Sequence, residues 1–101
     1  MRGMKMAYEG MEQFLKDRHN ALMAFIMRDD WDAIYAYCEK YGAELPSNER
    51  IARGSIYKAA LDCTDIPEKV KKIARQKLVA IGLKPIGALE RIAMERRRMM
   101  S

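Results

Sequence analysis

Residues 64–82 read TDIPEKVKKIARQKLVAIG, and this stretch decides the fold of the chain. Thr64 or Asp65 can cap a helix by accepting a backbone N–H bond, and Pro67 suits the first turn because no N–H is needed there. Apolar residues then recur at steps of three and four, which is the spacing of one helix face. They are Ile66, Val70, Ile73, Ala74, Leu78 and Ile81. The stretch therefore predicts a helix that ends at Gly82, since glycine readily adopts the left-handed conformation that closes a helix.

The preceding segment predicts another helix, opened by Ser47 or Asn48 and running to about Cys63. Its expected core side consists of Ile51 or Ala52, Ile56, Ala59, Ala60 and Cys63. Gly54 lies in the middle and costs a helix about 1 kcal/mol relative to alanine. We therefore expect either a close helix crossing or a break at Gly54.

Two further helices are expected upstream, over residues 8–27 and 31–41. Asp29 or Asp30 can cap the second of them, and Gly42 can end it. The apolar positions of the first are Tyr8, Met11, Phe14, Leu15, Leu22, Phe25 and Ile26. Those of the second are Trp31, Ile34, Tyr35, Cys38 and Tyr41, with Tyr37 expected to be exposed.

A last helix is expected after Lys84-Pro85, lined by Ile86, Leu89, Ile92 or Ala93, and Met99. Residues 94–101 should fray unless a partner or a second copy covers them. Because no segment alternates with the period of a strand, the fold class is all-α. We expect a single small domain over residues 1–101, with four to five short helices in an orthogonal array or bundle and a core at about 8–93.

Charge is distributed unevenly along the chain. Residues 1–46 carry 6 Lys and Arg against 8 Asp and Glu, whereas residues 47–101 carry 13 against 6. A basic surface attracts phosphate-rich or acidic partners. Candidate nucleic-acid contacts are Lys69, Lys72, Arg75, Arg96, Arg97 and Arg98. The alternative is a solvated face that contacts no ligand.

Nine methionines in 101 residues are many, and most of them lie in the first and last segments. Methionine adapts its shape and is frequent at protein-binding surfaces. The candidate interface residues are Met11, Met23, Met27, Met94 and Met99. They predict a homodimer that forms through the terminal helices, and an ordinary methionine-rich core is the alternative.

Motifs of catalysis are missing from the sequence, so we expect neither an enzyme nor a cofactor. It contains no phosphate-binding loop and no nucleophile elbow, and His19 is its one histidine. Cys38 and Cys63 are expected to be buried thiols, and with one histidine they cannot complete a zinc site. The charged N-terminal segment does not fit a signal peptide, and no apolar stretch reaches the roughly 18 residues of a membrane span. The expected location is the cytoplasm.

Five short motifs between about residues 31 and 86 suggest a relationship. They are Tyr37-Cys38-Glu39-Lys40-Tyr41-Gly42, Leu45-Pro46, Ile56-Tyr57-Lys58-Ala59, Thr64-Asp65-Ile66-Pro67 and Gly82. This stretch resembles small helical proteins encoded in phages and prophages of Firmicute bacteria, a family with no established activity. Because the motifs are caps and turns, the resemblance implies a shared fold and no functional residues. The basic, methionine-rich C-terminal end departs from the shorter family pattern.

These observations lead to one expected function and one alternative. The first is a cytoplasmic, phage-related accessory protein that acts by binding another protein. The alternative is a nucleic-acid-binding protein that uses the basic face of the 64–82 helix and the C-terminal arginines. Salt separates the two, because phosphate contacts make affinity fall steeply as ionic strength rises.

Overall fold

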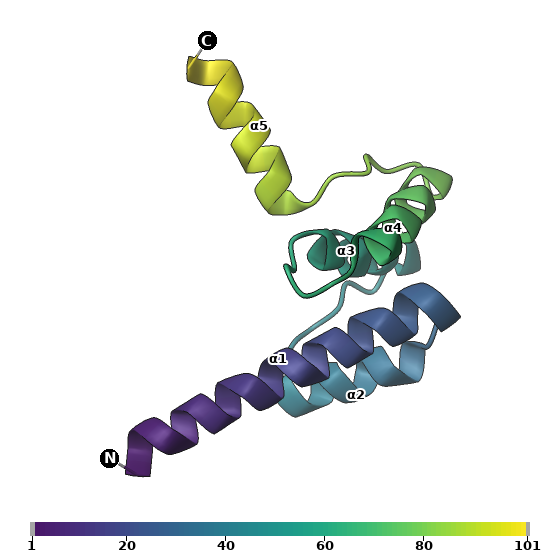
Figure 1. Ribbon diagram of the computed structural model, residues 1–101. Helices are drawn as coiled ribbons and strands as arrows, with labels where there is room; N and C mark the ends of the chain where they lie inside the picture. Colours follow the sequence, from purple (N-terminus) through teal and green to yellow (C-terminus); the bar gives the residue numbers. More distant parts are fainter. Residues whose placement is uncertain (1, 101) are drawn as a thin grey trace. The chain divides into compact units, whose positions relative to one another are not determined.

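Five α-helices form the protein in the computed structural model, which describes the backbone of residues 2–100 and the side chains of residues 10–100 (Figure 1). They are α1 (Arg2–Arg28), α2 (Trp31–Tyr41), α3 (Glu49–Leu61), α4 (Glu68–Ala80) and α5 (Ala88–Met100). The backbone described contains no strand, so the all-α prediction is confirmed. The chain divides into two compact units, residues 1–43 and 44–101.

The first unit is a hairpin of α1 and α2. Asp29 turns the chain between them with a left-handed backbone (φ 56°), and the Asp30 side chain accepts the N–H of Ala33 at 3.1 Å. Gly42 ends α2 with a φ of 67° and donates its N–H to the carbonyl of Cys38. The predicted boundaries of α2 are therefore confirmed, with Asp30 as the cap.

Aromatic rings fill much of the contact between α1 and α2. Phe25 is buried and meets Trp31 edge-on, with ring centroids 4.7 Å apart. Nearer the end of α2, Phe14 packs edge-on against Tyr41, with centroids 5.0 Å apart. Leu22, Ile26 and Ile34 are also buried. The side chain of Tyr8 lies outside the described side chains.

The predicted exposure of two tyrosines on α2 is wrong. Tyr35 is 57% exposed, whereas Tyr37 is half-buried between Phe14 and Tyr41, with centroids 6.0 and 5.1 Å away. Around the helix, Tyr37 lies closer than Tyr35 to the buried position of Ile34. Phe14 on α1 then provides a ring for Tyr37 to pack against.

The second unit is built on the pair α3 and α4. Asn48 caps α3 by accepting the N–H of Ile51 at 3.0 Å, which confirms one of the two predicted caps. Gly54 is buried, and a β-carbon there would collide with the Leu83 side chain. The mid-helix glycine therefore marks a close packing contact.

The start of α4 differs from the prediction. Its N-cap is Pro67, with no side-chain hydrogen bond, so neither Thr64 nor Asp65 caps the helix. The Pro67 carbonyl instead accepts the N–H groups of Val70 and Lys71, each at 3.0 Å. Pro67 thus stands just before the first turn of the helix rather than within it.

The core between α3 and α4 contains Ala52, Ile56, Tyr57, Ala60, Val70, Ala74 and Leu78. Tyr57 is buried although its apolar role was not predicted, and Ala59 is exposed although it was expected in the core. Of the alternatives Ile51 and Ala52, only Ala52 is buried. Gly82 follows α4 with a φ of 79°, which confirms the predicted stop.

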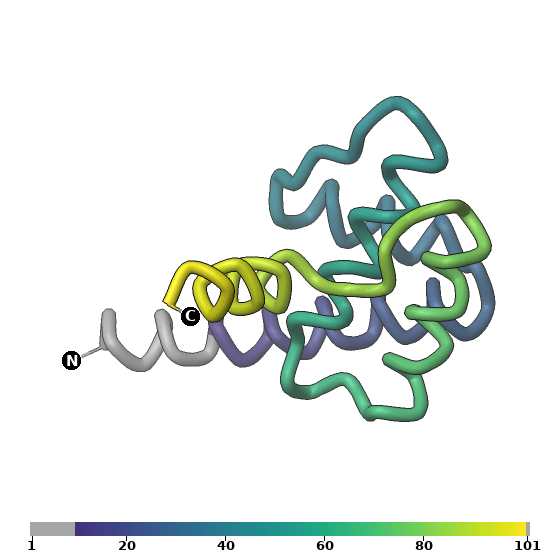
Figure 2. The backbone as a smooth tube through the Cα atoms, turned by 90° about the horizontal axis from the view of Figure 1, so that it is seen from above, coloured from purple at the N-terminus to yellow at the C-terminus, as the bar shows by residue number. Residues whose placement is uncertain are grey.

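A loop over Gly82–Gly87 follows α4, and after it helix α5 leads away from the α3–α4 pair (Figure 1, Figure 2). It is helical to Met100, and the fraying of residues 94–101 stays a prediction. This arrangement leaves α5 attached to its unit mainly through its first turn.

Candidate functional site

The first turn of α5 is held by the carboxylate of Asp62, at the end of α3. Asp62 Oδ2 accepts the N–H of Leu89 at 3.3 Å, and so caps the helix from a distant part of the sequence. Gly87 is buried beside this carboxylate, and a β-carbon there would collide with Asp62 Oδ1. Glycine at position 87 is what allows α5 to start so close to α3.

Arg75 of α4 also holds this turn, through contacts with Pro85 and Glu90. Its Nη1 donates to the Pro85 carbonyl at 2.6 Å, and its Nη2 lies 3.1 Å from Glu90 Oε1. The sequence suggested Arg75 as a phosphate contact, whereas the structure commits its guanidinium to α5. Arg75 is a positioning residue for α5, a role that the sequence did not reveal.

Helix α5 contains no buried residue, in its first turn or beyond it. Most of its apolar side chains lie on one side of the helix, where Arg96 occupies the position between the two apolar groups. We call them the α5 stripe: Leu89, Ile92, Ala93, Met99 and Met100. Leu89 is 63% exposed, Ile92 48% and Met99 88%. Because an isolated helix of this length is marginally stable in water, an open stripe on α5 is unusual unless something covers it.

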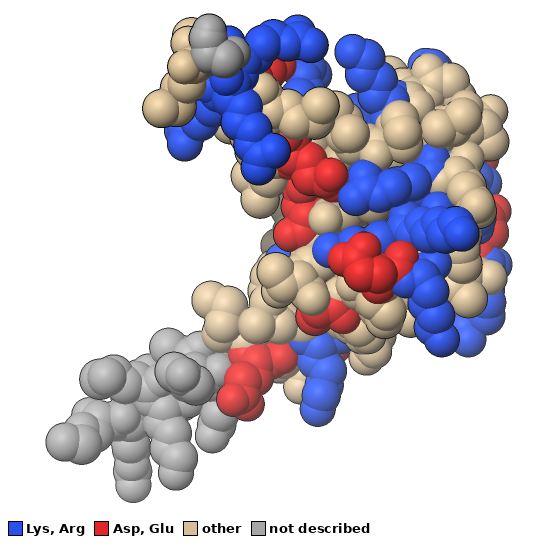
Figure 3. Space-filling view, turned by 45° about the horizontal axis from the view of Figure 1, so that its top comes forward, with Lys and Arg blue, Asp and Glu red and all other residues tan. Residues whose placement is uncertain are grey.

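Arginines lie both within and beside the α5 stripe, with Arg96 on the same side of the helix as Ile92 and Met99. Four arginines and two glutamates give α5 a net charge of +2. Arg91 pairs with Glu95 at 3.1 Å, while Arg96, Arg97 and Arg98 are exposed. Figure 3 shows Lys and Arg side chains gathered around this helix. Helix α5 therefore offers an apolar stripe within a positive surface.

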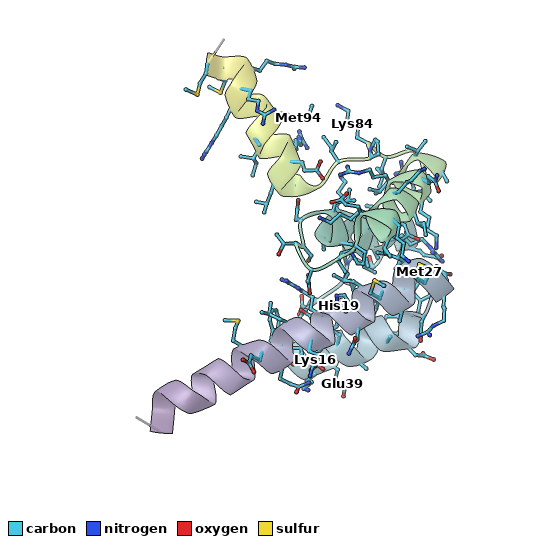
Figure 4. All side chains as sticks on the ribbon, in the orientation of Figure 1. Lys16, His19, Met27, Glu39, Lys84 and Met94 are labelled. Atoms are coloured by element: carbon cyan, nitrogen blue, oxygen red, sulfur yellow. The ribbon has the colours of Figure 1, made fainter. Side chains whose placement is uncertain are left out.

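A groove of about 490 Å³ runs beside the first half of α5. One wall is α5, with Arg91, Ile92 and Glu95, and the other is the Gly82–Gly87 loop together with Lys58 of α3. Figure 4 shows Lys84 standing up from this loop next to α5. Apolar and basic side chains of the second unit therefore both line this groove.

The remaining basic candidates lie on the outer face of α4. Lys69 and Lys72 are both exposed one turn apart. The next exposed positions on that face are Gln76 and Val79, which are uncharged. With Arg75 committed to α5, the outer face of α4 offers two cations rather than a continuous basic row.

The predicted methionine interface is distributed over both units. Met11 and Met27 are exposed on α1, where Met23 is half-buried. Met94 and Met99 are exposed on α5, and Figure 4 labels Met27 and Met94 on their separate helices. Four of the five methionines are thus available for contact, and self-association stays a prediction.

A polar cluster in the first unit joins α1 to α2. Asp17 accepts hydrogen bonds from Lys40 Nζ and Gln13 Nε2, at 2.7 and 2.8 Å, and from the Tyr41 hydroxyl. These bonds, that from Lys40 foremost, lower the pKa of Asp17 from 3.8 to about 2. With its oxygens already satisfied, this carboxylate stabilises the hairpin. The 23-residue separation of Asp17 and Lys40 hides the cluster from sequence analysis.

The thiols and the histidine are not among the residues that line the groove. Cys63 is buried, with its Sγ 3.1 Å from the Ala59 carbonyl, and burial raises the pKa of the half-buried Cys38. His19 is half-buried on α1. Among the residues with described side chains, no three His, Cys, Asp or Glu are placed to hold a metal ion. In the same part of the chain no helix is long and apolar enough to cross a membrane.

Comparison with known proteins finds no matching protein family, no matching curated protein and no matching solved structure. The resemblance to phage-encoded proteins therefore stays a hypothesis based on its caps and turns.

Proposed function

We propose that this chain is a non-enzymatic binding protein of the cytoplasm, and that it docks a different protein through α5. One observation carries the proposal: a helix of 13 residues has no buried residue, yet its first turn is fixed by Asp62, Gly87 and Arg75. Such a helix is oriented before it binds, which reduces the entropy lost on association. An amphipathic helix laid into a partner's groove is a common mode of protein recognition. The phage-related accessory role rests on the sequence resemblance alone.

The exposed apolar stripe favours a protein partner over nucleic acid. Leu89, Ile92 and Met99 gain from burial against apolar groups, at about 25 cal/mol for each Å². A sugar–phosphate backbone supplies few such groups. The nucleic-acid alternative would use Lys69, Lys72 and the arginines at 96–98. Each phosphate contact would then contribute about 0.9 to the slope of log affinity against log salt.

A second copy of the chain is a less favourable occupant. Two α5 helices packed together would each bring a net charge of +2 into one small interface. An acidic or neutral partner avoids this repulsion. Charge thus favours a different protein over the homodimer.

The proposal is tested by placing a photo-reactive amino acid at position 92, and at position 76 as the control, in cells that express the protein. Both positions are exposed, but only Ile92 belongs to the α5 stripe. We expect position 92 to cross-link a protein of defined mass that position 76 does not reach. A cross-link only to DNA or RNA, only to a second copy, or to nothing would overturn the proposal.

A further inference from the structure

The groove beside α5 is lined by both apolar and basic side chains. Leu83 and Ile86 of the loop and Ile92 of α5 are its large apolar lining residues. Lys58 and Lys84 provide positive charge on the loop side. Because the lining combines these two chemistries, a matching occupant is both apolar and negatively charged.

From this arrangement we infer that the groove receives an acidic peptide segment of the docked protein. One apolar side chain of that segment would lie over Leu83, Ile86 and Ile92, and flanking carboxylates would pair with Lys58 and Lys84. The inference rests on the proposed function, because it names the chemistry of the partner that α5 docks.

The balance of charge in the groove supports a carboxylate ligand. Neither Lys58 nor Lys84 forms an ion pair with another described residue. The acid that lines the groove, Glu95, is already paired with Arg91 at 3.1 Å. Two positive charges therefore remain without compensation on one wall. Complementary charges set the specificity of such an interface and speed association.

The lining of the groove argues against a nucleic acid as its occupant. Single-stranded bases bind by stacking on aromatic rings. None of the described residues that line this groove is aromatic. An apolar side chain of a peptide, in contrast, matches Leu83, Ile86 and Ile92 directly. The volume of about 490 Å³ lies within the range of pockets that hold a small ligand or a few side chains.

The wall formed by α5 is held in place by contacts outside the groove. Arg75 fixes Pro85 and Glu90, and Asp62 caps Leu89. The spacing between α5 and the loop is therefore set before a peptide arrives. A site prepared in this way loses less entropy when it binds.

Selection of short random peptides displayed on phage, carried out on the full chain, tests the inference. We expect enrichment of peptides with Asp or Glu flanking Leu, Ile, Met or Phe. Binding of those peptides, synthesised with a fluorescent label, should weaken about tenfold or more in the variant K58E/K84E, since each carboxylate would then face a like charge. The control variant K69E/K72E makes the same charge change on α4 and should bind as the unmodified protein does.

Two controls accompany the binding test: one checks that the variant is folded, and the other reverses the charge of the peptide. Far-UV circular dichroism checks that K58E/K84E is folded, and K58Q/K84Q provides a milder change should it not be. Peptides with Lys in place of the acids should bind K58E/K84E better than the unmodified protein. Enrichment of basic peptides, of no common pattern, or equal weakening by K69E/K72E would overturn the inference.

The photo-cross-link at position 92 separates this inference from the proposed function. If docking is real and the groove is its acidic-peptide site, K58E/K84E lowers the cross-link yield and K69E/K72E does not. If the yield is unchanged in K58E/K84E, the inference fails while docking through α5 stands. If position 92 gives no protein cross-link at all, the proposed function itself fails.

Discussion

Helices α4 and α5 have the same length and both are basic, yet they contribute differently to the fold. Each has 13 residues and apolar side chains at helical spacing. Helix α4 buries Val70, Ala74 and Leu78 against α3, whereas α5 buries none of its residues. The two helices are similar in composition. They differ because a neighbouring helix covers the apolar face of α4 and no described helix covers that of α5. An apolar stripe covered within the chain stabilises the fold, and an open one is available to a partner.

One substitution on the apolar face of each helix, α4 and α5, gives the strongest test of this comparison. Leu78→Ala removes a fully buried side chain from α4 and should lower the free energy of unfolding by about 2–5 kcal/mol. Leu89→Ala changes an exposed position on α5 and should stay within about 0.5 kcal/mol. Urea unfolding followed by circular dichroism measures both values. A loss for Leu89→Ala comparable to that for Leu78→Ala would mean that the α5 stripe is already covered in the isolated protein.

Local signals explain how far the sequence predicted these helices. The caps and stops at Asp30, Gly42, Asn48 and Gly82 act on their immediate neighbours. Both ends of α2, the start of α3 and the stop after α4 could therefore be predicted from them. The burial of residues at the edges of an apolar helix face is harder to predict, because periodicity does not say on which side the neighbouring helix lies. Tyr35 was therefore expected in the core and is exposed.

The candidate site was predicted only in part, for a similar reason. The exposed arginines and methionines of α5 could be read from the sequence. The contacts that fix the helix could not, since Asp62 and Arg75 lie 27 and 15 residues from their partners Leu89 and Glu90. The groove depends on these contacts and was not foreseen. Contacts between distant residues follow from packing, which periodicity does not describe.

A substitution at Gly87 should loosen the attachment of α5 and leave α4 unchanged. A β-carbon in Gly87→Ala would collide with the Asp62 carboxylate, and overpacking of this kind costs about 1–3 kcal/mol. We expect amide hydrogen exchange to quicken along α5 while α4 stays protected. Gly10→Ala, where a β-carbon meets no other atom within 4 Å, is the control. Equal quickening in both helices would show that α5 is part of one cooperative unit with α4.

Removal of the Arg75 side chain should loosen α5 by a smaller amount. Its ion pair with Glu90 is about one-third exposed, so solvent weakens it. We expect Arg75→Ala to quicken exchange in the first turn of α5 about fivefold, which corresponds to about 1 kcal/mol. The control is Lys72→Ala on the outer face of the same helix, where no change in α5 is expected. If both variants behave alike, Arg75 does not position α5.

The smallest expected effect concerns Asp17, which joins α1 to α2 as Arg75 joins α4 to α5. Folding lowers the pKa of Asp17 from 3.8 to about 2, because Lys40, Tyr41 and Gln13 donate to its carboxylate. A lowered pKa means that the folded state favours the ionised form, so this contribution to stability is present above pH 3.8 and is lost as the pH falls toward about 2. The unmodified protein should therefore be more stable than Asp17→Asn at neutral pH, and the difference should shrink across this window. Thermal unfolding of both proteins at several pH values measures it, with Asp32→Asn, a change at an exposed acid of the same hairpin, as the control. A difference that stays constant with pH would show that the Asp17 carboxylate gains nothing from its charge in the folded hairpin.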